Sequence, residues 1–221
     1  FLHLTNDHLD YHGSMKKYLN SKLKIFNLQK KNYYALVNNR FKRDFKNKKF
    51  LSKFIPPEIF KFKKIKNKIN NDYLNSGIND ENMSFIFAFS KLIKIKENKL
   101  INSMKTFKGL PHRFEIFLKK KNITFINDSK ATSFEATRSA LSNLRNIYWI
   151  LGGLQKKNDV IDLSKFKKNI IKCYLIGKYT NFFQKHVKEK IVFSVTKNLK
   201  NSVIQILKDI KLHKKIKKNI L

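Results

Sequence analysis

Within 13 residues the chain passes from an apolar run through a polar loop into a helical pattern: Ile123-Thr-Phe-Ile-Asn-Asp-Ser-Lys-Ala-Thr-Ser-Phe-Glu135. The run Ile123–Ile126 predicts a strand. Thr132 and Glu135 have the spacing of a capping box, which predicts a helix to about Leu144. This order of strand, loop and helix is typical of an α/β fold.

The loop between that strand and that helix is a candidate binding site. A helix N-terminus presents free backbone N–H groups and a positive dipole end, and both favour anions. We therefore expect Asp128 to accept hydrogen bonds from a ribose and Lys130 to meet a carboxylate or phosphate. Thr132 is either a helix cap alone or also a ligand contact.

The second half of the chain alternates strands with helices. A hairpin is predicted first, with strands at Phe114–Leu118 and Ile123–Ile126. Two strands that end in glycines follow, Ile147–Leu151 and Cys173–Ile176. After a further helix come a strand at Ile191–Val195 and a last helix at Leu199–Leu212. This alternation predicts a parallel sheet covered on both faces. Ligands of such sheets bind beyond the carboxyl ends of the strands.

Two further motifs are candidates for binding, one at a strand end and one at the predicted domain junction. Gly152-Gly153 follows a strand and allows close backbone approach, and Lys156 after it is a candidate partner for a carboxylate. Leu110-Pro-His-Arg-Phe-Glu115 follows a helix stop, which suits Arg113 for holding phosphate. The alternative for Arg113 is a salt bridge between domains.

The first half has a different pattern. Ser14 predicts the cap of a helix to about Phe26, and 33–37 predicts a strand. Residues 40–75 are rich in Lys and give no clear pattern. Helices are predicted from Asn79 or Asp80 to about Ile93 and from about Lys99 to Phe107, and Gly109 with Pro111 ends the second of them. We expect a domain boundary there, with domains at 1–109 and 110–221.

Two features of the first half are candidates for chemistry. His8 and His12 are four residues apart, as in some zinc sites, but Gly13 follows them and no third ligand is evident. A hydrogen-bonded turn, or one His that binds a hard cation, are the alternatives. Lys22 is predicted to lie on the apolar stripe of its helix. Either its stem packs while the amine reaches water, or the amine reacts covalently or pairs with a bound anion.

The formal net charge is +34, which first suggests a nucleic-acid partner. However, the basic residues are 44 Lys and only 5 Arg, and they are spread along the chain. Arg is the preferred reader of phosphates and base edges. We therefore expect a solvated surface and no nucleic acid, with a Lys-rich nucleic-acid-binding module as the alternative. Cys173 is the single cysteine, and no apolar run approaches the roughly 20 residues of a membrane span, so no membrane partner is expected.

Taken together and in order, these motifs resemble the Mur ligases of peptidoglycan synthesis. Leu110–Glu115 followed by 125–132 is similar to the signature of their C-terminal domain, and 147–153 with Lys156 continues the match. Upstream, 4–14 and 21–26 resemble their central ATPase domain, and the pair of asparagines at 79 and 82 matches it too. The resemblance implies the second half of a P-loop-type central domain, followed by a Rossmann-like domain.

The resemblance also implies an activity: the ATP-dependent joining of D-glutamate to UDP-N-acetylmuramoyl-L-alanine through an acyl phosphate, in the bacterial cytoplasm. It implies ATP and Mg²⁺ as cofactors and a monomer at full length. The implied catalytic residues are His8, a magnesium ligand, and Lys22, which would bind magnesium once carbamylated. The implied nucleotide contacts are Asn79, Asn82, Arg113 and Asp128. The residues implied to line the phosphate and D-glutamate end are Lys130, Thr132 and Lys156.

Some features depart from the family. Asn6, Ile78 and Ser133 stand where other residues are usual, and no Gly-x-x-x-x-Gly-Lys-Ser/Thr loop is present. We therefore expect a fragment that is inactive alone. Another Mur ligase or a folylpolyglutamate synthase is the alternative within the superfamily.

Overall fold

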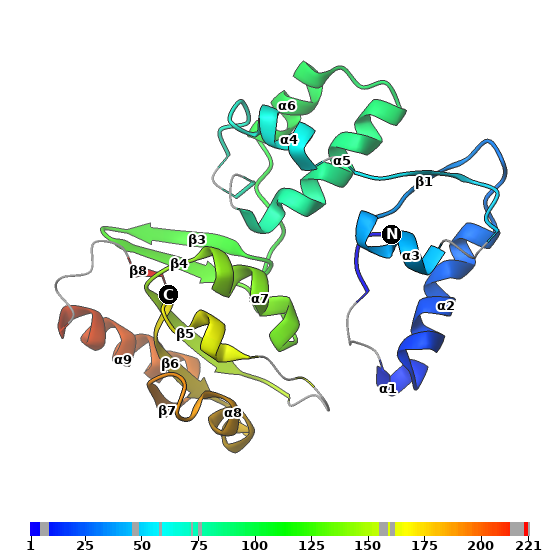
Figure 1. Ribbon diagram of the computed structural model, residues 1–221. Helices are drawn as coiled ribbons and strands as arrows, with labels where there is room; N and C mark the ends of the chain where they lie inside the picture. The colour runs from blue at the N-terminus through cyan, green and yellow to red at the C-terminus, as the bar shows by residue number, and fades with distance from the viewer. Residues whose placement is uncertain are drawn as a thin grey trace. The chain divides into compact units, whose positions relative to one another are not determined.

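The structure is a computed structural model (Figure 1) that describes residues 1–4, 9–45, 49–57, 59–71, 73–74, 77–154, 159, 162–212 and 219–220. The chain divides into two compact units, Phe1–Lys108 and Gly109–Leu221. Gly109 has a φ of +80°, a left-handed conformation that glycine adopts without steric cost. The first residue of the second unit is therefore one whose backbone can turn sharply after a helix.

In the first unit, a phenylalanine-rich core joins one helix to a two-stranded parallel sheet. Ser14 caps this helix, as predicted, because its Oγ accepts the N–H of Lys17 at 3.3 Å. The carbonyl of Phe1 accepts the N–H of Asn38 at 3.0 Å, so the extended segment 1–4 runs beside the first strand. The elements are α1 (Leu9–His12), α2 (Met15–Asn27), β1 (Tyr34–Leu36), η1 (Asn39–Phe41), α3 (Lys42–Phe45) and β2 (Lys53–Ile55).

Three helices form a second core in the first unit: α4 (Ile59–Lys66), α5 (Asp80–Leu92) and α6 (Glu97–Lys105), with the short turn η2 (Gly77–Asn79) before α5. Their apolar faces bury Phe62, Met83 and Met104 among other side chains. α4 lies within the segment 40–75 that the sequence pattern left unassigned. Both long helices after it match their predictions to within a few residues.

The second unit is built on a six-stranded sheet with the order β3-β4-β8-β5-β6-β7. β3 and β4 form the predicted antiparallel hairpin, and the other neighbouring strands pair in parallel. The parallel sheet of an α/β fold is thus confirmed. The strands are β3 (Glu115–Lys120), β4 (Ile123–Asn127), β5 (Ile147–Gly152), β6 (Ile170–Ile176), β7 (Phe193–Lys197) and β8 (Asn219–Ile220).

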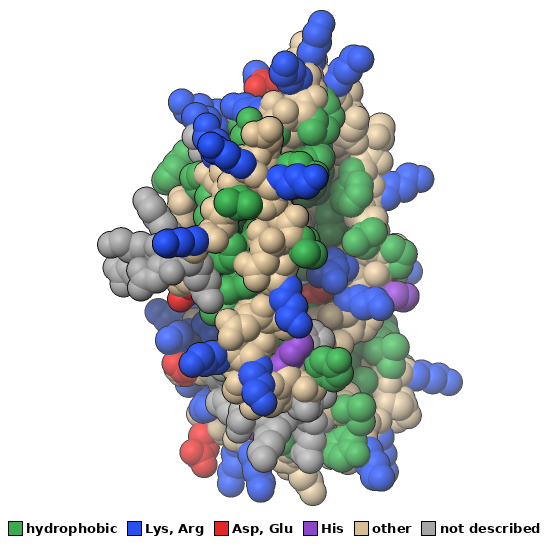
Figure 2. All heavy atoms as spheres, turned by 90° about the vertical axis from the view of Figure 1, so that its right-hand side faces the viewer, with side chains coloured by type: hydrophobic (Ala, Val, Ile, Leu, Met, Phe, Trp, Pro, Cys, Tyr) green, Lys and Arg blue, Asp and Glu red, His purple; other side chains and the backbone are tan. Residues whose placement is uncertain are grey.

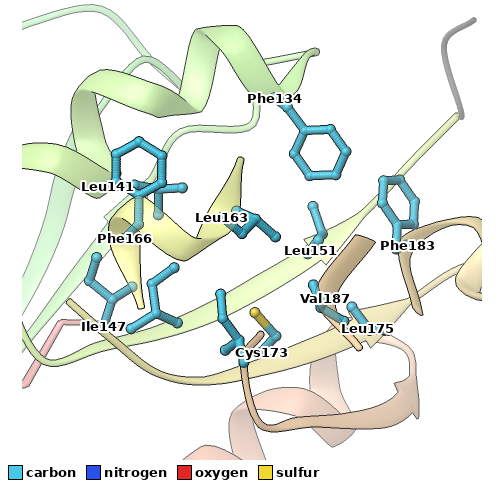
Figure 3. Close-up of a cluster of buried hydrophobic side chains, with 12 residues drawn as sticks. Phe134, Leu141, Ile147, Leu151, Leu163, Phe166, Cys173, Leu175, Phe183 and Val187 are labelled. Carbon is cyan, nitrogen blue, oxygen red and sulfur yellow. The ribbon is translucent and has the colours of Figure 1, made fainter. Parts of the chain in front are cut away.

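Helices cover both faces of this sheet. Successive side chains of a strand point to opposite faces, so the apolar side chains of β6 are buried on both. On one face, Cys173 and Leu175 of β6 pack with α7 (Phe134–Asn143), η3 (Leu163–Phe166) and α8 (Thr180–Val187). Figure 3 shows these side chains converging on one cluster. On the other face, Tyr174 between them packs against α9 (Leu199–Leu212).

A buried polar network fixes α9 to the sheet. Asp209 of α9 is 6% exposed and accepts hydrogen bonds from the Tyr174 hydroxyl at 2.5 Å and the Lys172 amine at 2.8 Å. Gln205 donates to its second oxygen at 3.0 Å. Burial alone would raise the pKa of Asp209, but these hydrogen bonds outweigh it and hold the pKa below its ordinary value.

The distribution of surface charge and the hydropathy of the helices concern two partner classes, nucleic acid and membrane. Figure 2 shows Lys and Arg side chains distributed over the whole of one face, between hydrophobic and polar ones. Across the described ranges, every helix falls short of the length and apolarity that crossing a bilayer requires.

Candidate functional site

Two loops of the second unit are joined by hydrogen bonds. The loop before β3 carries Phe114, whose N–H donates to the Asp128 carboxylate at 2.9 Å, and Asp128 lies in the loop after β4. In return, Lys130 of the second loop donates its N–H to the carbonyl of His112 at 2.9 Å. The hairpin of β3 and β4 brings the loops together, because the start of β3 (Glu115) pairs with the end of β4 (Asn127) in antiparallel register.

The first loop has an unusual backbone that these contacts hold in place. His112 and Phe114 have φ values of +63° and +49°, in the left-handed region that non-glycine residues rarely adopt. Such conformations persist where the surroundings fix them. Glu115 accepts the N–H of His112 at 2.8 Å, and the Asn127 amide lies 2.8 Å from the His112 Nδ1. Arg113 is therefore held between two fixed residues.

The site combines a carboxylate with nearby positive charge. Burial raises the pKa of Asp128 above its ordinary value, while the Phe114 N–H and the Arg113 charge oppose that rise. Arg113, Lys130 and Thr132 are exposed. A partly buried acceptor beside exposed cations can bind a ligand that has both hydroxyl groups and negative charge. The structure thus brings four of the predicted site residues into one pair of loops.

The start of α7 differs from the prediction. The cap is Ser133 and not Thr132, because the Ser133 Oγ accepts the N–H of Ala136 at 3.2 Å and the backbone of Ser133 is extended. The predicted capping box was therefore wrong by one residue. The N–H of Phe134, the first residue of α7, donates to the Asp159 carboxylate, with distances of 2.9 and 3.0 Å to its two oxygens. One carboxylate of the chain itself thus already occupies part of this helix N-terminus.

Glycine is required at the carboxyl ends of β5 and β6. A Cβ on Gly152 would lie 2.5 Å from the carbonyl oxygen of Ile176 on the neighbouring strand. Gly177, with φ +83°, follows β6 in a left-handed turn. The backbones at this edge of the sheet therefore approach more closely than side chains permit. Lys156, predicted to act beside them, lies outside the described residues.

In the first unit, α2 places Lys22 against aromatic rings. The amine is 4.9 Å from the centre of the Tyr18 ring and 6.0 Å from that of Phe1, and the side chain is half-buried. Lys22 lines an open cavity of about 840 Å³, together with residues of α2, β1 and α5. Among the described residues, no carboxylate forms an ion pair with it. His8 lies outside the described residues.

The two predicted asparagines stand at the start of α5. Asn79 is 6% exposed and donates its side-chain N–H to the carbonyl of Tyr73 at 2.7 Å, so it fixes the chain before the helix. Asn79 stands at the N-cap position of α5, one of the two predicted starts, but its backbone is already helical and its amide is turned to Tyr73 rather than to the helix N–H groups. Asn82 is half-buried in the first turn.

His8 of the zinc alternative lies outside the described residues, and within the described part of the chain no group of three potential metal ligands occurs. Sequence reasoning also missed three residues that shape the site. Glu115 and Asn127 hold His112, and Asp159 binds the start of α7. Only Glu115 had a local signal, since it lies three residues after His112 in the same turn.

Comparison with known proteins identifies the family. Residues 1–108 match the model of the Mur ligase middle domain. UDP-N-acetylmuramoylalanine–D-glutamate ligase of Wolbachia from Brugia malayi is 33% identical over 91% of this chain and 43% of its own length. The enzyme of the same name from Buchnera aphidicola of Schizaphis graminum is 35% identical over 95% of this chain and 51% of its own length. The chain belongs to the Mur ligase family.

The fold is also that of a Mur ligase. The MurF ligase of Thermotoga maritima, solved in complex with ADP, superposes with a TM-score of 0.64 over 98% of this chain and 55% of that chain, at 14% identity. At this identity the likeness concerns the fold alone. This Mur ligase chain spans about half the length of the curated relatives named above.

Proposed function

We propose that the whole protein joins D-glutamate to UDP-N-acetylmuramoyl-L-alanine at the expense of ATP, through an acyl phosphate. The observation that carries this proposal is the pair of joined loops that holds Arg113 beside Asp128, with Lys130 and Thr132 exposed next to them. These loops are the segments that resemble the C-terminal signature of Mur ligases. The relatives with the name of this activity support the choice of amino acid.

In this proposal, the loops bind the nucleotide. Asp128 uses one oxygen for the Phe114 N–H and accepts a ribose hydroxyl, and Arg113 meets the phosphates. Guanidinium groups suit phosphate because they donate two parallel hydrogen bonds. Asn82 at the start of α5 is a further proposed nucleotide contact, and Asn79 contributes by fixing that helix start.

Magnesium is the metal that the family implies. Mg²⁺ prefers oxygen ligands, so the ammonium form of Lys22 does not suit it, whereas a carbamate on that amine supplies a carboxylate. The position fits such a modification, because Lys22 is half-buried against Tyr18 and the described residues give it no competing carboxylate. His8 and carbamylated Lys22 would hold the ion. A bound magnesium ion neutralises charge that develops on transferred phosphate.

The amino-acid end of the site is assigned to Lys130, Thr132 and Lys156. Lys130 would bind a carboxylate of D-glutamate, which the positive dipole end of α7 also favours. Asp159 already accepts the Phe134 N–H. The incoming carboxylate therefore depends more on side chains of the loop than on the helix N-terminus itself.

Saturation-transfer NMR on the 221-residue chain with ADP present tests the amino-acid assignment. We expect transfer to D-glutamate, reduced in Lys130→Ala and retained in the surface control Lys200→Ala. Transfer to L-lysine, diaminopimelate or L-glutamate instead of D-glutamate would overturn the assignment in favour of another Mur ligase or a folylpolyglutamate synthase. Transfer to none of these would contradict the amino-acid site.

A phosphate-release assay tests the role of the missing motif. Since the chain contains no phosphate-binding loop of the Gly-x-x-x-x-Gly-Lys-Ser/Thr type, we expect it to release no phosphate from ATP. Robust ATP turnover by the 221-residue chain alone would contradict the expectation that phosphate release requires such a loop.

A further inference from the structure

Glu81, in the first turn of α5, gathers polar groups from two other segments of the first unit. Its carboxylate accepts a hydrogen bond from the Asn38 side chain, just after β1. The same carboxylate lies 3.7 Å from the Arg40 guanidinium and 3.5 Å from the His3 Nε2. Glu81 therefore contacts both the loop after β1 and the extended segment 1–4.

Arg40 closes this network. Its Nη2 donates to the carbonyl of Leu2 at 2.8 Å and lies 2.5 Å from the His3 Nδ1. Because the guanidinium has only donors, the His3 Nδ1 is the acceptor and the Nε2 side of the ring faces Glu81. Together, His3, Arg40 and Glu81 connect three segments that are far apart in the sequence.

The first turn of α5 is held from its other side as well. Asp80, the neighbour of Glu81, lies 2.5 Å from the Lys66 amine of α4 and 3.9 Å from that of Lys63. Acidic side chains at this position also suit the positive end of the helix dipole. Asn82 follows directly, so its position depends on how both carboxylates are held.

A purely stabilising role is the simplest alternative. Partly exposed ion pairs contribute little to stability, and the side chains of Glu81, Arg40 and His3 are 29%, 48% and 47% exposed. The network therefore adds little to stability, yet it joins the start of α5 directly to segment 1–4. That segment leads along the chain directly to His8.

We propose that Glu81 is a positioning residue that couples segment 1–4 to the start of α5. This inference rests on the proposed function, since it takes Asn82 to contact the nucleotide and His8 to be a metal ligand. Through Arg40 and His3, Glu81 holds segment 1–4, which leads along the chain to the proposed metal ligand His8, in register with the helix that carries Asn82.

Calorimetric titration of the 221-residue chain with ADP and Mg²⁺ tests the proposal, with Tm measured on the same samples. We expect Glu81→Gln and Arg40→Met each to weaken binding about fivefold or more while Tm changes little. The double variant should lose no more than either single variant, because both remove one interaction. The charge exchange Arg40→Glu with Glu81→Arg should restore part of the affinity. Glu97→Gln on α6, which removes an exposed ion pair with Lys68, is the matched control.

Unchanged affinity in Glu81→Gln, or additive losses that follow Tm, would overturn the proposal. Absence of ADP binding by the wild-type chain would contradict the proposed function instead, and amide NMR shifts of the unliganded chain then decide the inference. Coupling requires Glu81→Gln to shift the amides of residues 2–4 as well as that of Asn82, with Glu97→Gln shifting neither. Shifts confined to α5 would overturn it.

Discussion

The Asp128 carboxylate accepts the backbone N–H of Phe114 at 2.9 Å, and the β3–β4 hairpin lies between these two residues, which are 14 positions apart in the sequence. This contact fixes the loop that carries Arg113 against the loop that carries Lys130. It also takes up one carboxylate oxygen of a residue whose burial raises its pKa. The two loops are therefore joined before any ligand binds, and the pKa of the key acceptor lies above its ordinary value.

The affinity for ADP should decrease as the pH falls through the raised pKa of Asp128. Above that pKa the carboxylate is ionised and accepts a ribose hydroxyl well; below it, the protonated form is a weaker acceptor. Asp128→Asn should bind more weakly at neutral pH and lose this pH dependence. Calorimetric titration from neutral pH down toward the ordinary Asp pKa of about 3.9 checks both, and an identical pH profile in the variant would contradict the assignment.

Asp209→Ala should destabilise the second unit by about 3 kcal/mol, because it leaves the buried Lys172 amine and Tyr174 hydroxyl without their acceptor. Urea unfolding followed by tryptophan fluorescence measures this, since Trp149 lies on β5. Glu135→Gln is the control, because its ion pair with Arg138 is exposed and contributes at most about 1 kcal/mol.

The same network predicts how stability depends on pH. The folded pKa of Asp209 is below its unfolded value, so its contribution is present above the unfolded pKa, about 3.9. That contribution is lost as the pH falls through the folded pKa. Asp209→Asn should therefore flatten the acid limb of the stability curve, and an unchanged acid limb would count against an ionised Asp209.

Ser133→Ala should cost about 1 kcal/mol of stability, because it removes the oxygen that accepts the Ala136 N–H at the start of α7. Ser133→Gly should cost only a few tenths of that, about 0.3 kcal/mol, since glycine is tolerated at this position. Chemical denaturation of both variants and of Thr132→Ala separates the two candidate caps. A larger loss in Thr132→Ala than in Ser133→Ala would restore the predicted capping box.

Gly152 and Gly177 should differ in their response to substitution. Gly152→Ala places a Cβ 2.5 Å from a strand backbone, so we expect a loss of about 1–3 kcal/mol. Gly177→Ala meets no atom within 4 Å but must keep φ +83°, which costs about 1–2 kcal/mol. Asparagine tolerates the left-handed region, so Gly177→Asn should be milder than Gly177→Ala, whereas Gly152→Asn should be as harmful as Gly152→Ala. If Gly177→Asn were as harmful as Gly177→Ala, this distinction would be contradicted.

Most elements of the second unit could be predicted from the sequence, because their patterns are local. The strand ending at Gly152 and the hairpin at 115–127 have short apolar runs bounded by turn residues. By contrast, α4 at 59–66 escaped prediction because lysines interrupt its apolar face. Its helical state depends on packing of Phe62 and Ile65 against α5 and α6, which no local pattern reveals.

The candidate site was predictable to a similar degree. Arg113, Asp128, Lys130 and Thr132 were identified by their place at strand ends and helix starts. Asp159 was not, because it reaches Phe134 from 25 residues away in sequence. The His3–Arg40–Glu81 network was missed for the same reason, since each member by itself is an ordinary surface side chain.

The account depends on a nucleotide site at the joined loops. Calorimetric titration of ADP with Mg²⁺ into the wild-type chain and into Arg113→Ala tests it most directly. We predict saturable binding by the wild type and a loss of about tenfold or more in the variant, since a hydrogen bond to a charged group contributes about 1.5–3 kcal/mol. Equal affinities of the two chains for ADP would contradict the assignment.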